Sequence, residues 1–174
     1  WEKHLIGVET VVHLAARVHI MNETTANPLD EFRKVNTQAT INLAMTAKRM
    51  GIKRFIFISS IKVNGEQTFE TPFLFSDTPH PEDNYAQSKY EAEVELMKLH
   101  EPGRFEVVII RPTLIYGPGV RANFANLIRM VQLRIPLPFG CVQNKRSLLS
   151  VYNLCDLILL TMLKPEASGQ IFIA

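Results

Sequence analysis

The feature that most constrains the fold is a short apolar run that ends in two serines. Residues 55–58 read Phe-Ile-Phe-Ile, and Ser59 and Ser60 follow them directly. An unbroken apolar run of this length, bounded by a polar loop, is typical of a strand buried on both faces of a parallel sheet. We therefore expect a buried strand whose carboxyl end carries two hydroxyl groups.

Further apolar runs alternate with helical patterns along the chain. Residues 11–15 and 105–111 predict strands beside the strand at 53–59, and residues 28–50 and 84–100 have apolar faces at helical spacing. This alternation predicts an α/β fold, in which helices cover both faces of a parallel sheet and the crossovers are right-handed. The last six residues also have the pattern of a strand.

Composition and charge exclude several classes of protein. The 174 residues are enough for one domain with a hydrophobic core, and the formal net charge of +2 gives no argument for nucleic acid or a membrane surface. No apolar run approaches the roughly 20 residues of a membrane span. Cys141 and Cys155 lack metal or redox spacing, and His13 is expected to be a packed core histidine. We expect no metal site, no nucleic-acid or membrane partner, and a cytoplasmic setting.

A tyrosine and a lysine at the start of the second helix form a candidate acid/base pair. Tyr85 and Lys89 are four residues apart, so they lie on one helical face. The positive charge is expected to favour the phenolate and to lower the pKa of the tyrosine. The hydroxyl of Ser60 could hold a substrate oxygen while Tyr85 transfers a proton. Most such pairs are ordinary solvated neighbours, so the interpretation depends on the rest of the sequence.

An ordered set of motifs gives this pair its weight. The set comprises Val-Val-His-Leu-Ala-Ala at 11–16, Asn36, the Ser59-Ser60 strand end, Tyr85 with Lys89, and Arg111-Pro112 leading to Tyr-Gly-Pro-Gly at 116–119. In this order it resembles the NAD-dependent epimerase/dehydratase family of extended short-chain dehydrogenase/reductases, a group acting on nucleotide sugars with UDP-glucose 4-epimerase as its best-known member. The resemblance covers nearly the whole chain. It implies a Rossmann-type sheet, NAD as cofactor with NADP not excluded, and a nucleotide-sugar substrate.

The resemblance also implies roles for individual residues. The catalytic set is Ser60, Tyr85 and Lys89. The expected cofactor-binding residues are Leu14, Ala15, Ala16, Asn36, Ser59, Tyr85, Lys89 and Pro112. For three of these residues an alternative without a cofactor stays open. The two alanines could be a tightly packed strand end, and Asn36 could be a buried amide that bridges a helix to a strand.

The expected substrate-binding residues are Ser60, Lys62, Tyr85, Asn123 and Arg146. Lys62, two residues past the serine, is unusual for the family, and it either contacts a substrate oxygen or faces solvent. Asn123 is either a diphosphate contact or a helix cap. Arg146 suits a diphosphate because its guanidinium can donate two hydrogen bonds to phosphate oxygens, and the alternative is a surface cation.

We expect two regions and an incomplete parent fold. Residues 1–112 are predicted to be the second part of a Rossmann-type domain, and residues 113–174 the start of a substrate-binding region with a returning strand and helix. The chain has no glycine-rich loop of the Gly-x-Gly-x-x-Gly type, which in the family holds the cofactor pyrophosphate at a helix amino terminus. We therefore expect a fragment of a longer protein, with the first strand-helix-strand unit absent.

Three functions stay open at this point. The first is an epimerase or 4-ketoreductase of a UDP-hexose or UDP-N-acetylhexosamine. For such an enzyme the resemblance also implies a homodimer, which we expect to form through helices 28–50 and 84–100. Dehydration is disfavoured, because Ile61 and Lys62 follow Ser60 where dehydratases have an Asp-Glu pair. The second is a reductase of a non-sugar alcohol or ketone. The third is an inactive fragment that serves as a binding or structural module.

Overall fold

The main sheet has four parallel strands. The structure is a computed structural model, and it describes residues 1–18, 27–120, 122–134, 136, 140 and 142–174. The strands lie in the order β1 (Thr10–His13), β2 (Arg54–Ile58), β3 (Glu106–Arg111) and β6 (Ile171–Ile173). This arrangement confirms the predicted α/β fold with a Rossmann-type parallel sheet.

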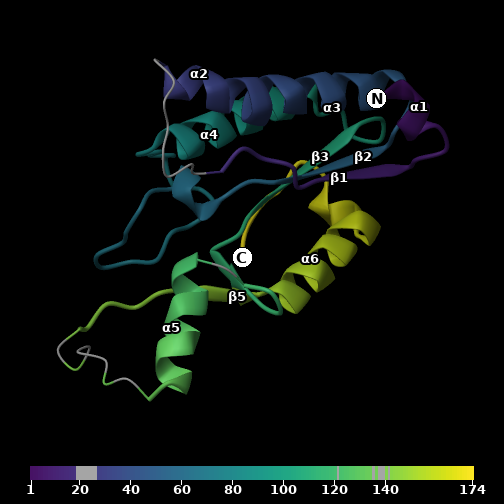
Figure 1. Cartoon of the computed structure of the whole chain (residues 1–174). Coiled ribbons are helices and arrows are strands. Elements are labelled where there is room, and N and C mark those ends of the chain that lie inside the picture. The colour runs from purple at the N-terminus through teal and green to yellow at the C-terminus, as the bar shows by residue number, and fades with distance from the viewer. Residues whose placement is uncertain (19–26, 121, 135, 137–139, 141) are drawn as a thin grey trace.

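Helices cover both faces of this sheet (Figure 1). One layer contains α2 (Pro28–Phe32), the π-helical turn η1 (Arg33–Gln38), α3 (Ala39–Arg49) and α4 (Asn84–Leu99), with the short α1 (Glu2–Leu5) beside α3. On the other face lies α6 (Val151–Leu163), which η3 (Pro165–Ala167) joins to β6. The remaining elements are the turn η2 (Ile61–Val63), the helix α5 (Ala122–Gln132), and the parallel pair β4 (Leu114–Tyr116) and β5 (Leu148–Ser150).

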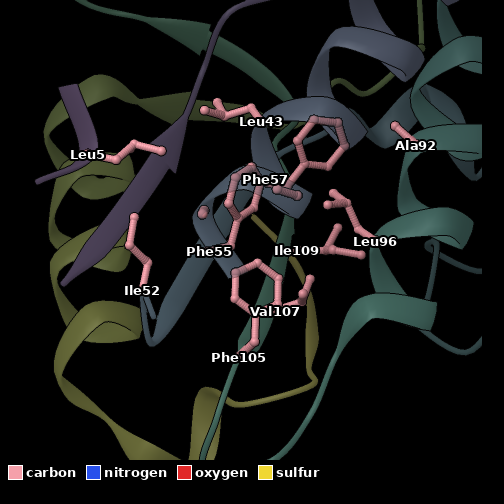
Figure 2. Close-up of a cluster of buried hydrophobic side chains, with 12 residues drawn as sticks. Leu5, Leu43, Ile52, Phe55, Phe57, Ala92, Leu96, Phe105, Val107 and Ile109 are labelled. Atoms are coloured by element: carbon pink, nitrogen blue, oxygen red, sulfur yellow. The ribbon is translucent and has the colours of Figure 1, made fainter. Parts of the chain in front are cut away.

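The hydrophobic core divides into two layers because strand side chains alternate between the faces of the sheet. Phe55 and Phe57 of β2 point into the layer of α3 and α4 together with Phe105, Val107 and Ile109 (Figure 2). The intervening residues point the other way, where Ile56, Ile58, Val108 and Ile110 pack against Leu154 and Ala167. All five residues of β2 are buried; the apolar run predicts this for residues 55–58, and the buried Arg54 precedes that run.

The first long helix differs from the prediction. Residues 28–50 were expected to form one helix, but the π-helical turn η1 separates α2 from α3. The Asn27 side chain makes no hydrogen bond to the helix backbone, and its Nδ2 donates to Asp30 Oδ2 at 2.6 Å instead. The turn matters for the site, because Asn36 lies within it.

The carboxyl-terminal third also departs from the prediction. The returning helix expected in this region begins at Val151, where Ser150 Oγ accepts from Tyr152 N at 3.3 Å. Within it only Leu154 and Thr161 are buried. β5 is the strand that this region was expected to contain, but its partner β4 was not anticipated; β6 returns to the main sheet as a strand beside β3.

Candidate active site

The carboxyl ends of β1, β2 and β3 meet at one edge of the sheet, and the Ser60 turn lies there. Ser59 N donates to Ile110 O at 2.7 Å, and Ile61 N donates to Pro112 O at 3.0 Å. These bonds hold the serines against the end of β3. Ser60 then caps the turn η2, because its Oγ accepts from Lys62 N at 3.3 Å.

The helix α4 brings Tyr85 and Lys89 to the same edge. It begins at Asn84 because the Asp83 side chain caps it, with Oδ1 accepting from Ala86 N at 2.6 Å. The Tyr85 phenol lies in hydrogen-bonding contact with Ser60, and its ring meets Phe32 edge-on with centroids 6.5 Å apart. The structure therefore brings the predicted serine and tyrosine together.

Lys89 is held one turn further along α4, beneath the serines. Its side chain is buried, its Nζ donates to Ile58 O at 2.8 Å, and the ammonium lies 4.4 Å from the centroid of the Phe57 ring. Burial lowers the pKa of Lys89 to about 8, and the nearby Glu93 carboxylate opposes this change. A lysine with this pKa can give or accept a proton near neutral pH.

The pKa of Tyr85 moves opposite to the sequence-based expectation. Burial raises the pKa of this phenol, and the Asp83 carboxylate raises it further, while Lys62 and the Ser60 hydrogen bond lower it. Lys89 was expected to supply the positive charge. Its ammonium instead points to the Ile58 carbonyl, and Lys62 is the cation that acts on the phenol. The expectation that Lys89 lowers the pKa of Tyr85 is wrong for this structure.

The residues predicted to hold a cofactor gather at the same edge, and one of them has an unused polar atom. Ser59 Oγ is buried and has no hydrogen-bond partner within the described part of the chain. Leu14, at the end of β1, is 60% exposed and Ala15 is also exposed, while Pro112 is buried behind Ile61. Exposed apolar surface beside a buried, unpaired hydroxyl fits a bound group that has both apolar and polar atoms.

Asn36 connects this edge to the helix layer. Its Oδ1 accepts from Arg17 N at 2.7 Å, and its Nδ2 donates to Arg17 O at 3.0 Å and to Ser88 Oγ at 2.9 Å. Ser88 Oγ donates in turn to Tyr85 O at 2.8 Å. The amide is fully buried, so it bridges the chain after Ala16 to the helix that carries Tyr85. The alternative of a bridging buried amide therefore describes its contacts, whatever else it binds.

The predicted substrate residues are less closely gathered. Lys62 is half-exposed and its ammonium pairs with Glu66 and Asp83. Arg146 is exposed in the segment before β5. The side chain of Asn123 lies outside what the structure describes, although its backbone belongs to α5. The roles of these three residues toward a substrate stay predictions.

A buried polar cluster beneath the site was missed from the sequence. Arg111 and Glu93 are each only 2% exposed, and Arg111 Nε and Nη2 donate to Glu93 Oε1 at 3.0 Å and Oε2 at 2.5 Å. Arg111 Nη1 donates to Asn64 Oδ1 at 2.9 Å, and Asn64 Nδ2 donates to Leu74 O at 2.9 Å. A signal was present, because Glu93 continues the buried face of Lys89 and Arg111 ends a strand of apolar residues.

Two kinds of site are absent from the residues that the structure describes. That part of the chain contains no group of His, Cys, Asp or Glu side chains that could hold a metal ion, and none of its helices is long and apolar enough to cross a bilayer. His13 packs as predicted, with Nε2 2.9 Å from Thr40 Oγ1 and its ring stacked on Phe57. Burial, and then the Lys89 charge, lower the pKa of His13 to about 4.

Known proteins of similar sequence and structure indicate the family to which this chain belongs. UDP-glucose 4-epimerase of Vibrio cholerae is 54% identical over 175 residues, a match that covers 99% of this chain and 53% of that protein. N-acetyl-alpha-D-glucosaminyl-diphospho-ditrans,octacis-undecaprenol 4-epimerase of Escherichia coli O157:H7 is 29% identical, with 98% and 50% covered. DesIV, a dTDP-glucose 4,6-dehydratase from Streptomyces venezuelae solved with NAD bound, superposes with a TM-score of 0.81 at 24% identity, over 99% of this chain and 53% of that one.

The chain thus spans about half the length of the curated relatives it matches. A family profile covers residues 2–174, which include every strand of the sheet together with Ser60, Tyr85 and Lys89. From this match and the 54% identity, the chain belongs to the NAD dependent epimerase/dehydratase family.

Proposed function

We propose that the protein carrying this chain is an NAD-dependent nucleotide-sugar 4-epimerase, or a 4-ketoreductase of the same substrates. One observation carries the proposal. Ser60, Tyr85 and Lys89 come from a strand end and a helix far apart in sequence, yet they meet at the carboxyl edge of the sheet. Ligands of open parallel sheets bind at this edge. The 54% identity to UDP-glucose 4-epimerase of Vibrio cholerae supports a UDP-hexose or UDP-N-acetylhexosamine as substrate.

The residues at this edge fit NAD. Leu14, Ala15 and Ala16 would face its ribose and nicotinamide half, Ser59 offers an unpaired hydroxyl, and Pro112 closes the far side. Asn36 would hold the backbone on which the cofactor lies, through its two bonds to Arg17. NAD when bound supplies the acceptor and donor of hydride. NADP is an alternative that these residues do not exclude.

The proton chemistry falls to the chain's own side chains. Tyr85 would take the proton of the sugar 4-hydroxyl, and Ser60 would hydrogen-bond the same oxygen and hold it in line with the phenol. Lys89 would hold the end of β2 through its bond to Ile58 O, and the pKa of its ammonium is lowered to about 8. The absence of an Asp-Glu pair after Ser60 argues for epimerisation or reduction rather than dehydration.

Binding of the nucleotide and assembly are part of the same proposal. Asn123 and Arg146 are the proposed contacts to the sugar and diphosphate, whereas the ammonium of Lys62 is already paired with Glu66 and Asp83. We also propose a homodimer through the helices at 28–50 and 84–100, in the cytoplasm. Val35, Met45 and Val94 are exposed apolar side chains on these helices, and their burial between two copies would favour association.

The test is the interconversion of UDP-glucose and UDP-galactose by the full-length protein with NAD. Tyr85→Phe removes the proton carrier, and we expect kcat to fall by about 10²–10⁴-fold. Tyr90→Phe on the same helix is the matched control and should retain activity. Stoichiometric consumption of reduced cofactor with a 4-keto sugar would instead identify the ketoreductase.

Other outcomes would overturn the proposal. Turnover of a non-sugar alcohol that does not change in Arg146→Ala would identify the reductase of non-sugar substrates. A folded full-length protein that binds NAD but transforms no nucleotide sugar would leave a binding or structural module as the remaining function.

A further inference from the structure

The ammonium of Lys62 lies in a cluster of charges beside the tyrosine. Its Nζ is 2.8 Å from Asp83 Oδ2 and 2.7 Å from Glu66 Oε1. Two carboxylates from two different segments therefore fix its place, one from the loop after η2 and one from the start of α4. A lysine that merely faces solvent would need neither partner.

Lys62 also connects the two halves of the proposed proton-transfer site. Its backbone N–H donates to Ser60 Oγ at 3.3 Å, so the residue contacts the serine directly. Its side chain pairs with Asp83, whose other carboxylate oxygen accepts from Ala86 N at 2.6 Å and so caps the helix that carries Tyr85. One residue thus contacts Ser60 by its backbone and the amino end of α4 by its side chain.

We propose that Lys62 is a positioning residue for proton transfer: paired with Asp83 and Glu66, it ties the Ser60 turn to the amino end of α4 and sets the charge beside the Tyr85 phenol. This inference rests on the proposed function, and it assigns Lys62 a role toward Tyr85 rather than toward the substrate. The occupied ammonium favours this role, because contact with a phosphate would require it to leave at least one carboxylate.

The two members of the ion pair act on Tyr85 in opposite senses. Beyond burial, the Asp83 carboxylate raises the pKa of the phenol, while Lys62 and the Ser60 hydrogen bond lower it. From α2 the phenol faces the Phe32 ring, over which the Arg17 guanidinium lies 5.5 Å from the centroid. The Lys89 ammonium one turn away is bound to a carbonyl. Lys62 and Asp83 are therefore the two charged groups that shift the pKa of Tyr85, in opposite directions.

These opposite senses allow a test that a simple structural tie would fail. In full-length protein with ¹³Cζ-labelled tyrosine, the Tyr85 signal is assigned by its loss in Tyr85→Phe, and its titration midpoint is followed by NMR. Lys62→Met should raise the midpoint. Asp83→Asn should lower it, since asparagine caps a helix as well as aspartate does and only the charge is lost. The pH profile of kcat should move in the same two directions.

Matched controls come from the other end of α4. Lys98 and Glu95 form an exposed ion pair three residues apart, and Lys98 lies about 20 Å along the helix from Tyr85. This distance exceeds the Debye length of about 8 Å at physiological salt. Lys98→Met and Glu95→Gln should therefore leave the midpoint of Tyr85 and the pH profile unchanged.

The outcomes separate this inference from the function on which it rests. Midpoints that move in the same direction in both variants, or that do not move, overturn the positioning role. So does a Lys62→Met variant whose KM rises while its midpoint stays in place, because that result assigns the lysine to the substrate. Midpoints that move oppositely in a protein without epimerase or reductase activity would support the role of Lys62 and refute the proposed function.

Discussion

We predict that Glu93→Gln strongly destabilises the fold, because Glu93 forms a buried ion pair with Arg111. The substitution keeps the size of the side chain and replaces one carboxylate oxygen with an N–H₂ group. In the folded chain that carboxylate accepts three hydrogen bonds from Arg111. The amide would bring one donor against another and would leave a buried guanidinium without its counter-charge, since water reaches neither residue.

The size of the effect follows from this burial. Breaking a buried ion pair by removing one partner costs about 3–5 kcal/mol, far more than an exposed pair contributes. A domain has about 5–15 kcal/mol of stability in total. With a urea dependence of about 2 kcal/mol per molar, the midpoint of unfolding should fall by roughly 1.5–2.5 M.

Urea unfolding of the full-length protein, followed by circular dichroism, measures this change. Glu95→Gln is the control, because it makes the same chemical change two residues along α4 in an exposed pair with Lys98, and its midpoint should match that of the parent. A Glu93→Gln midpoint equal to that of the control would refute the argument. It would mean that the pair is solvated or that the cluster rearranges at little cost.

Two further predictions concern Lys89 and Asn36. The pKa of Lys89 is about 8 in the folded chain and 10.5 in a free lysine, so the folded state loses this proton first as pH rises. The free energy of unfolding should therefore increase between about pH 8 and pH 10.5, by about 3 kcal/mol in all. The increase should be absent from Lys89→Met, and equal pH dependence of parent and variant in urea titrations would contradict it. Asn36→Ala removes the side chain that bonds to both Arg17 N and Arg17 O and should cost about 1–3 kcal/mol, with amide exchange of the Arg17 segment speeding up first. Unchanged exchange there would show that Asn36 is not what holds that segment.

Much of the fold follows from periodicity, and the reason lies in β2. Residues 55–58 of β2 and their partners at 107–110 of β3 have apolar side chains on both faces, which only a covered parallel sheet accommodates. The two long helices were predictable because their apolar faces repeat with helical spacing. The π-helical turn was not, since no local propensity distinguishes residues 33–38 from an α-helix. β4 was missed because a three-residue strand just after Pro112 carries too little pattern.

The candidate site divides in the same way. Ser60 and Tyr85 could be paired from the sequence, because strand ends and helix starts of a parallel sheet meet at one edge. The charges around Tyr85 could not, since they depend on where long side chains point. The Lys89 ammonium donates to the Ile58 carbonyl, and the Lys62 ammonium pairs with the Asp83 carboxylate. Asp83 itself was within reach of sequence reasoning as an aspartate directly before a helix.

The π-helical turn at Arg33–Gln38 holds one residue more than an α-helical turn, so the helix takes up an extra residue without rotating the segments on either side. Phe32 before the turn faces the Tyr85 ring, while Leu43 and Ala47 after it face the sheet. Removing the extra residue would restore a regular α-helix and leave these side chains on their present faces. It would change the backbone around Asn36, which lies in the turn and bonds to Arg17 and Ser88. A one-residue deletion there should therefore disturb the chain beside the site more than the core packing.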